Sequence, residues 1–165
     1  MITIPTTFVL GAGACEELGY PTGQKLRNDI CGNFQQGTER FEKLLNLGFE
    51  SQEIESFISA LRFCPKYSVD AFLENRKEFI SVGKAAIATE LIAYENSETL
   101  MKKASWYRYL FNAMDSSFTT FKDNQCRFVS FNYDRSLEAY FFYGLKNTYG
   151  KSDSEVKHIL DSIPI

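Results

Sequence analysis

The chain has a single histidine, His158, and its four cysteines lie far apart, at positions 15, 31, 64 and 126. None of the cysteines shows the paired spacing that is typical of zinc-binding sites. This sparse set of soft ligands predicts no metal site. It also predicts thiols that stay reduced, as they do in the cytoplasm.

The sequence has no block of one charge and no long apolar run. Its 18 basic and 21 acidic residues give a net charge of -3 and are interspersed along the chain. This disfavours nucleic acid and anionic membrane surfaces as partners. Residues 1–5 contain no basic side chain and are too short for a targeting signal. We therefore expect neither a membrane span nor a leader, and the sequence shows no internal repeat or low-complexity segment.

The sequence has enough apolar residues to form a hydrophobic core, because 44% of the 165 residues are hydrophobic and 15% are aromatic. The pattern predicts a first strand over residues 6–10, which leads into the turn Gly11-Ala12-Gly13-Ala14-Cys15 and then a helix. Glycines let the backbone approach a ligand closely, and N–H groups at the start of a helix attract anions. The turn therefore predicts a phosphate-binding site.

A second apolar strand is predicted over residues 126–131, and it delivers Asn132 and Asp134 at its carboxyl end. Open α/β sheets bind their ligands at that edge. If the two strands pair in parallel, the glycine turn and Asn132 border one site. Taken alone, Asn132 and Asp134 also fit a plain turn and helix N-cap.

The predicted fold is α/β, with a Rossmann-like parallel sheet that is incomplete in this chain. Residues 35–122 show helical periodicity and predict about five helices, which form a large insert between the two strands. The Rossmann-like core then comprises residues 1–34 and 123–165. A helix is expected from Asp134 to near Gly150, and the capping-box sequence Ser152-Asp153-Ser154-Glu155 predicts the start of a last helix. The apolar residues 163–165 look like the start of a third strand.

A standard dehydrogenase is disfavoured by two positions. Glu16 stands where the dinucleotide fingerprint has its third glycine. In the dinucleotide-binding fold, an acidic residue that binds the ribose ends a second strand about twenty residues further on. Asp29 falls within that range but lies in a helical pattern. Nucleotide binding in a different layout remains open.

Two motifs in this order resemble those of the sirtuin-like domains. The first comprises the glycine turn and Gly19-Tyr20-Pro21-Thr22-Gly23, where the family has Gly-Ala-Gly-Ala-Ser and then Gly-x-Pro. The second is Phe131-Asn132-Tyr133-Asp134, which is similar to the Phe-Asn-Tyr-Asp of the bacterial anti-phage defence branch. Residues 68–73 and Trp106-Tyr107 also look like that branch, so the resemblance covers essentially the whole chain.

The resemblance implies a function and a site. Members of this branch cleave NAD during anti-phage defence, often as one domain of a larger oligomer. The residues that it places around the NAD pyrophosphate are Gly11, Ala12, Gly13, Ala14 and Cys15. It places Pro21 and Thr22 in a loop over the cofactor, and Asn132 and Asp134 near the nicotinamide and its ribose. Asn132 is then the candidate catalytic residue, and no metal is required.

The sequence departs from the family in two places. Cys15 replaces the usual serine, and we expect it to be a buried structural thiol rather than a nucleophile. His158 lies inside a predicted helix and does not match the family's His-Gly motif, which would begin just beyond Ile165. We therefore expect one partial sirtuin-like domain over residues 1–165, with further C-terminal domains and homo-oligomers in the whole protein.

Two functional classes follow from these expectations. The first is an NAD hydrolase of the defence type that releases nicotinamide. The second is a module that senses NAD or a related nucleotide, or that serves assembly, without turning the nucleotide over. Protein deacylation is the least favoured alternative, because the four-cysteine zinc module of the true deacylases is missing.

Overall fold

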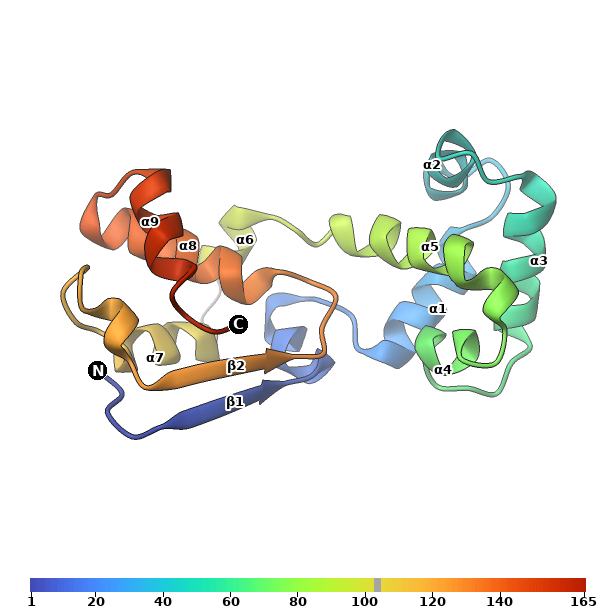
Figure 1. Cartoon of the computed structure of the whole chain (residues 1–165). Helices are drawn as coiled ribbons and strands as arrows, with labels where there is room; N and C mark the ends of the chain where they lie inside the picture. The colour runs from blue at the N-terminus through green and yellow to red at the C-terminus, as the bar shows by residue number, and fades with distance from the viewer. Residues whose placement is uncertain (103–104) are drawn as a thin grey trace. The chain divides into compact units, whose positions relative to one another are not determined.

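A computed structural model describes residues 1–102 and 105–165 and shows a mixed α/β protein that is 60% helical. Figure 1 shows the order of its helices and strands. In chain order they are β1 (Thr6–Leu10), η1 (Ala12–Leu18), α1 (Gly23–Asn33), α2 (Glu39–Asn46), α3 (Ser51–Arg62), α4 (Val69–Leu73), η2 (Lys77–Phe79), α5 (Ile80–Ile92), α6 (Ser97–Lys102), α7 (Trp106–Ala113), η3 (Phe121–Asp123), β2 (Cys126–Ser130), α8 (Ser136–Tyr149) and α9 (Asp153–Leu160). The η elements are short 3-10 helices. In the described part of the chain, no helix is both long enough and apolar enough to span a bilayer.

The chain forms two compact units. The sheet unit comprises Met1–Gly19 and Glu95–Ile165, and the helical unit is Tyr20–Tyr94. These bounds differ from the predicted insert of 35–122. Helix α1 packs on α3, α4 and α5, whereas α7 packs on α8, which follows β2. Between residues 35 and 122 the described residues form six α-helices rather than about five.

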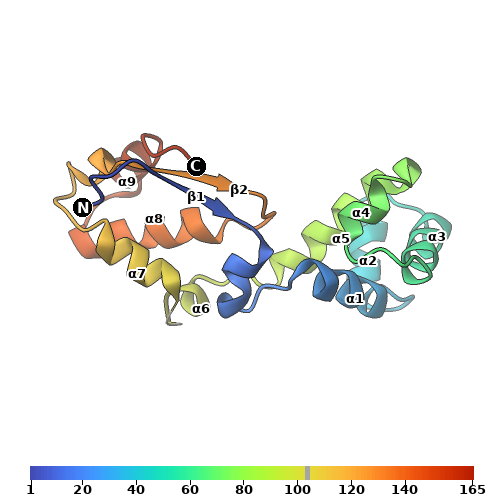
Figure 2. The ribbon, with the colours of Figure 1, turned by 90° about the horizontal axis from the view of Figure 1, so that it is seen from below.

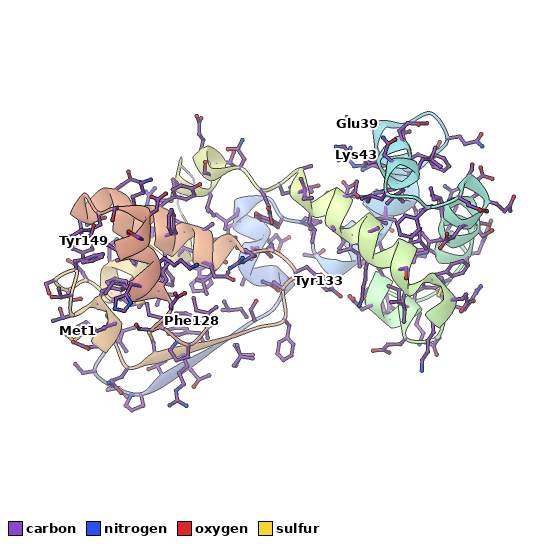
Figure 3. All side chains as sticks on the ribbon, turned by 45° about the horizontal axis from the view of Figure 1, so that its top comes forward. Met1, Glu39, Lys43, Phe128, Tyr133 and Tyr149 are labelled. Carbon is purple, nitrogen blue, oxygen red and sulfur yellow. The ribbon has the colours of Figure 1, made fainter. Side chains whose placement is uncertain are left out.

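The sheet unit is built on two parallel strands, which Figures 1 and 2 show side by side and running in the same direction. Thr6 pairs with Cys126 and Leu10 with Ser130, so both strands end at the same edge. Phe8 stacks on Phe128 at a ring-centroid distance of 5.2 Å. Figure 3 shows Phe128 on the side of β2 that faces α8, where its ring contacts Phe141.

The other face of the strand pair is open in the described residues. Val9 and Val129 are partners in the register and remain 67% and 44% exposed. Residues 163–165, predicted as the start of a third strand, have no strand assignment. Their backbone nevertheless lies beside β2, because the Phe128 N–H donates to the Pro164 carbonyl at 2.9 Å. Only two strands are therefore present in the described sheet.

The helices after β2 follow the sequence closely. The spacing predicted a helix from Asp134 to near Gly150, and α8 covers Ser136–Tyr149. The last helix, α9, starts with the predicted capping box, in which the Ser152 hydroxyl accepts from the Glu155 N–H and the Glu155 carboxylate accepts from the Ser152 N–H. Hydrogen bonds to the Glu155 carboxylate from the Ser152 N–H, the Ser152 hydroxyl and Lys151 hold the pKa of Glu155 down at about 2. Local sequence therefore determines where these helices begin.

The helical unit contains one buried carboxylate among its apolar core residues. Glu90 on α5 is 1% exposed and pairs with the Arg40 guanidinium on α2. Its Oε1 atom also accepts a hydrogen bond of 3.1 Å from Asn33 on α1. The carboxylate therefore connects three helices through its two oxygens.

Replacing Glu90 with glutamine is expected to lower the free energy of unfolding of the helical unit by about 3 kcal/mol, because it leaves the Arg40 charge without its partner. The matched control is Glu39→Gln. Glu39 pairs with Lys43 on the same helix at 2.8 Å, and its side chain is 77% exposed (Figure 3). Because solvent screens that exposed pair, its loss is expected to change stability very little. Urea unfolding followed by circular dichroism measures both values, and equal effects would contradict a structural role for Glu90.

Candidate functional site

The glycine turn lies immediately after β1, at the carboxyl edge of the strand pair. Gly11 has an extended backbone, with φ of −118° and ψ of 178°. Its carbonyl accepts from the Ala14 N–H at 2.8 Å and so starts the short helix η1. That helix is a 3-10 helix and ends at Gly19, whose φ of 95° favours glycine. The sequence predicted a helix at this point, and the structure gives a tighter one.

The fold itself does not explain Gly11 and Gly13. Neither residue has a positive φ. A Cβ atom added at either position would meet no heavy atom of the described residues within 4 Å. Neither backbone conformation nor internal packing therefore requires glycine here. The open space beside both glycines leaves room for a ligand to approach the backbone.

Asn132 and Asp134 follow β2 and reach the same edge as the glycine turn, as the sequence predicted. The Asn132 N–H donates to Ser130 Oγ at 3.2 Å, which turns the chain away from the strand direction. Asp134 Oδ1 accepts from the Ser136 N–H at 3.0 Å, close to the start of α8. Part of the role of Asp134 is therefore to form a turn just before α8, whose N-cap residue is Arg135.

A polar cluster at this edge connects the residues that follow β1 with those that follow β2. Its members are Cys15, Tyr107, Asn132, Asp134 and Ser136. The Cys15 sulfur lies 3.2 Å from Asn132 Nδ2, 3.2 Å from Ser136 Oγ, 3.3 Å from the Tyr107 hydroxyl and 3.4 Å from Asp134 Oδ1. The hydroxyls of Tyr107 and Ser136 lie 2.7 Å apart. One thiol therefore contacts the four other members of the cluster.

Burial keeps the Cys15 thiol and the Tyr107 phenol neutral. Cys15 and Tyr107 are each 1% exposed, and Ser136 is also buried. Loss of hydration raises the pKa of Cys15, while its hydrogen bonds to Ser136 and Tyr107 partly oppose that rise. Loss of hydration also raises the pKa of Tyr107, and the contact with Cys15 adds to this. A protonated thiol is a poor nucleophile, so these surroundings favour the structural role expected for Cys15.

The cluster leaves one acceptor unused. Asn132 Oδ1 is buried and has no hydrogen-bond partner among the described residues. Asn132 Nδ2, in contrast, donates to Cys15. A buried carbonyl without a donor is unfavourable by about 1–3 kcal/mol, so such an atom calls for an explanation. A ligand that brings a donor to the amide would supply one.

Three residues of the site were not assigned to it from the sequence. Trp106 donates its indole N–H to the Ala14 carbonyl at 2.7 Å and so holds the glycine turn from α7. Tyr107 and Ser136 complete the polar cluster. Trp106 and Tyr107 were noted only as part of the family resemblance, whereas Ser136 carried no signal.

The remaining candidates lie elsewhere in the chain. Pro21 and Thr22 belong to the helical unit, where Thr22 precedes α1 and Pro21 is buried. Their predicted place over a cofactor stays a prediction. His158 is exposed on α9, a helix that packs on α8 and η3, and it is not a member of the polar cluster.

Comparison with known proteins adds no further guide. No protein-family model, no curated protein sequence and no solved structure shows significant similarity to this chain. Within residues 1–102 and 105–165, no three His, Cys, Asp or Glu side chains come together as a group that could hold a metal ion. What the chain offers is a mixed α/β fold with a polar site at the carboxyl edge of two parallel strands.

Proposed function

We propose that this edge binds NAD and that the chain is the NAD-binding part of a sirtuin-like NAD hydrolase in bacterial anti-phage defence. One observation carries the proposal. The glycine turn after β1 and Asn132 after β2 meet at one edge of the parallel strands, where the Asn132 amide donates to Cys15. Open α/β folds bind nucleotides at this kind of edge, and the two sequence motifs that resemble the sirtuin-like domains are the two that meet there.

The proposal assigns the NAD pyrophosphate to the backbone of Gly11, Ala12, Gly13 and Ala14. The open space beside the two glycines supports this, because a phosphate needs close access to backbone N–H groups. Cys15 lies beneath this turn. Pro21 and Thr22 are assigned to a loop over the cofactor, on the resemblance alone.

The reaction proposed is cleavage of the bond between ribose and nicotinamide. Such a step passes through an oxocarbenium-like state, as at other glycosidic centres. Asn132 and Asp134 are assigned to the nicotinamide and its ribose. The unpartnered carbonyl of Asn132 is suited to orient a water molecule or a ribose hydroxyl. An amide does not accept a proton well, so a general base has to come from another group.

The second candidate is a sensor or assembly module that binds NAD or a related nucleotide without cleaving it. The absence of a histidine from the polar cluster favours this candidate, because the only histidine of the chain is exposed on α9. Both candidates share the same site. On either one we propose a cytoplasmic protein that forms homo-oligomers and carries further C-terminal domains, with neither nucleic acid nor a membrane as partner.

Titration of the chain with NAD in a calorimeter tests the shared part of the proposal. We expect saturable binding of NAD and much weaker binding of nicotinamide, which lacks the pyrophosphate. No binding of NAD at millimolar concentration would contradict both candidates. Binding without release of nicotinamide would favour the sensor.

A further inference from the structure

The polar cluster has a fixed direction of hydrogen bonding. The carboxylate of Asp134 can only accept hydrogen bonds, and the thiol of Cys15 has a single hydrogen to give. That hydrogen goes to Asp134 Oδ1, because a carboxylate is a stronger acceptor than a neutral oxygen. The sulfur is then left with lone pairs only and has to accept from its other neighbours.

The hydroxyls supply some of these hydrogens. Tyr107 and Ser136 together have two, of which one forms the 2.7 Å bond between them and the other is available to the sulfur. The remaining neighbour of the sulfur is the Asn132 amide. If this amide were turned by 180°, its carbonyl would face the lone pairs of the sulfur. Two acceptors would then face each other, and the hydrogen bond between Asn132 and Cys15 would be lost.

We propose that Cys15 is a positioning residue, which fixes the Asn132 amide so that its carbonyl oxygen, and not its amino group, faces the ligand. The inference rests on the proposed function in one respect, since it takes the ligand at this edge to be NAD. It adds that the part of NAD next to Asn132 offers a hydrogen-bond donor. A ribose hydroxyl, the carboxamide N–H or a bound water qualifies, and a phosphate oxygen does not.

Neutrality of the thiol supports this role. Because burial raises the pKa of Cys15, the thiol keeps its hydrogen at physiological pH. A thiolate would have no hydrogen to share with Asp134, and the two negative groups would repel each other. The family's usual serine keeps the same single hydrogen at this position, so Cys15→Ser preserves the direction of the cluster.

The orientation of the amide can be measured without any ligand by nuclear magnetic resonance on chain labelled with ¹⁵N-asparagine. The Asn132 side-chain signal is identified by its loss in Asn132→Asp. In Cys15→Ala we expect this signal to move toward the position of solvent-exposed asparagines and its hydrogens to exchange faster. Cys15→Ser is expected to retain the original signal. Cys126→Ala is the matched control, because Cys126 is also buried but lies at the start of β2, at the opposite end of the strand from Asn132.

Affinity for NAD gives the second readout. We expect Cys15→Ala to weaken binding about tenfold, which corresponds to the loss of about one hydrogen bond at the site. Cys15→Ser is expected to recover most of that loss, and Cys126→Ala to leave affinity unchanged. Asp134→Asn replaces the carboxylate at the same volume. It serves as the second variant if Cys15→Ala does not fold, and it is expected to shift the Asn132 signal as well.

The two readouts separate failure of this inference from failure of the proposed function. If the Asn132 signal in Cys15→Ala equals that of the unchanged chain, the positioning role is overturned. Where the alanine variant does not fold, an unchanged signal in Asp134→Asn has the same meaning. An equal effect of Cys15→Ala and Cys126→Ala on affinity overturns it too. If the unchanged chain does not bind NAD at all, the proposed function fails, and the resonance signal alone decides the role of Cys15.

Discussion

Replacing Gly13 with valine is expected to weaken binding of NAD at least about a hundredfold while the chain stays folded. A branched side chain at this position would occupy the space that a phosphate needs to reach the backbone. The fold itself has room for it, because no heavy atom apart from the neighbouring residues and the backbone of the same helix lies within 4 Å of an added Cβ in the described part of the chain. The backbone at Gly13 also lies outside the positive-φ region, so valine brings little strain. Calorimetric titration with NAD measures the effect.

Two further variants make this result specific. Gly13→Ala adds only a methyl group, and we expect a smaller loss than with valine. Gly32→Ala is the matched control, since Gly32 on α1 is equally open and belongs to the helical unit. Its affinity for NAD should equal that of the unchanged chain, and all three variants should melt within a few degrees of one another. Unaltered affinity in a folded Gly13→Val chain would mean that the phosphates lie elsewhere.

The elements of the fold that depend on neighbouring residues were predicted well from the sequence. Both strands occur within a residue of their predicted bounds, and α9 starts with the predicted capping box. Strand alternation and caps are local signals, which sequence patterns carry directly. The mixed α/β class follows from the same signals. A Rossmann-like sheet remains a proposal, because the described sheet has two strands.

Features set by long-range packing were not predicted in the same way. The division of the chain falls at Tyr20 and Tyr94 rather than at residues 35 and 122, because the apolar side of α1, including Leu26 and Ile30, packs with α3, α4 and α5. Periodicity predicted that α1 is a helix but not which helices it contacts. Tertiary contacts decide such boundaries, and a single sequence does not display them.

The candidate site shows the same difference between local and long-range features. Its two motifs could be read directly, because each follows an apolar strand. The hydrogen-bond partners of Cys15 could not, since Tyr107 and Ser136 lie 92 and 121 residues further along the chain. A tyrosine in an amphipathic helix predicts a core side chain, and nothing local shows that its hydroxyl meets a thiol. The preference of buried polar groups for partners predicts that such a cluster exists, but not its members.

Asn132→Ala is expected to remove release of nicotinamide from NAD while weakening the binding of NAD only about tenfold, which corresponds to the loss of about one hydrogen bond. Binding is assigned mainly to the glycine turn, whereas Asn132 is assigned to the orientation of the attacking water or ribose hydroxyl. The chain of 165 residues is expected to release nicotinamide only slowly. It places no histidine in the polar cluster, and loss of a positioned general base lowers the rate by about a hundredfold to ten-thousandfold. In a longer chain that carries the His-Gly motif implied by the resemblance, the same substitution is expected to abolish turnover.

Chromatography of nicotinamide, with protein in excess over NAD and long incubations, measures this slow release. Asn147→Ala is the matched control, since Asn147 is an exposed asparagine on α8 whose amide donates to the Tyr143 carbonyl. The control should release nicotinamide at the rate of the unchanged chain, and Asn132→Ala at the rate of NAD in buffer. Equal rates in Asn132→Ala and the unchanged chain, both above buffer, would remove Asn132 from the mechanism. A rate in the unchanged chain no higher than in buffer, together with tight binding of NAD, would favour the sensor. A site that binds the whole of NAD without releasing nicotinamide can report the presence of NAD but does not cleave it.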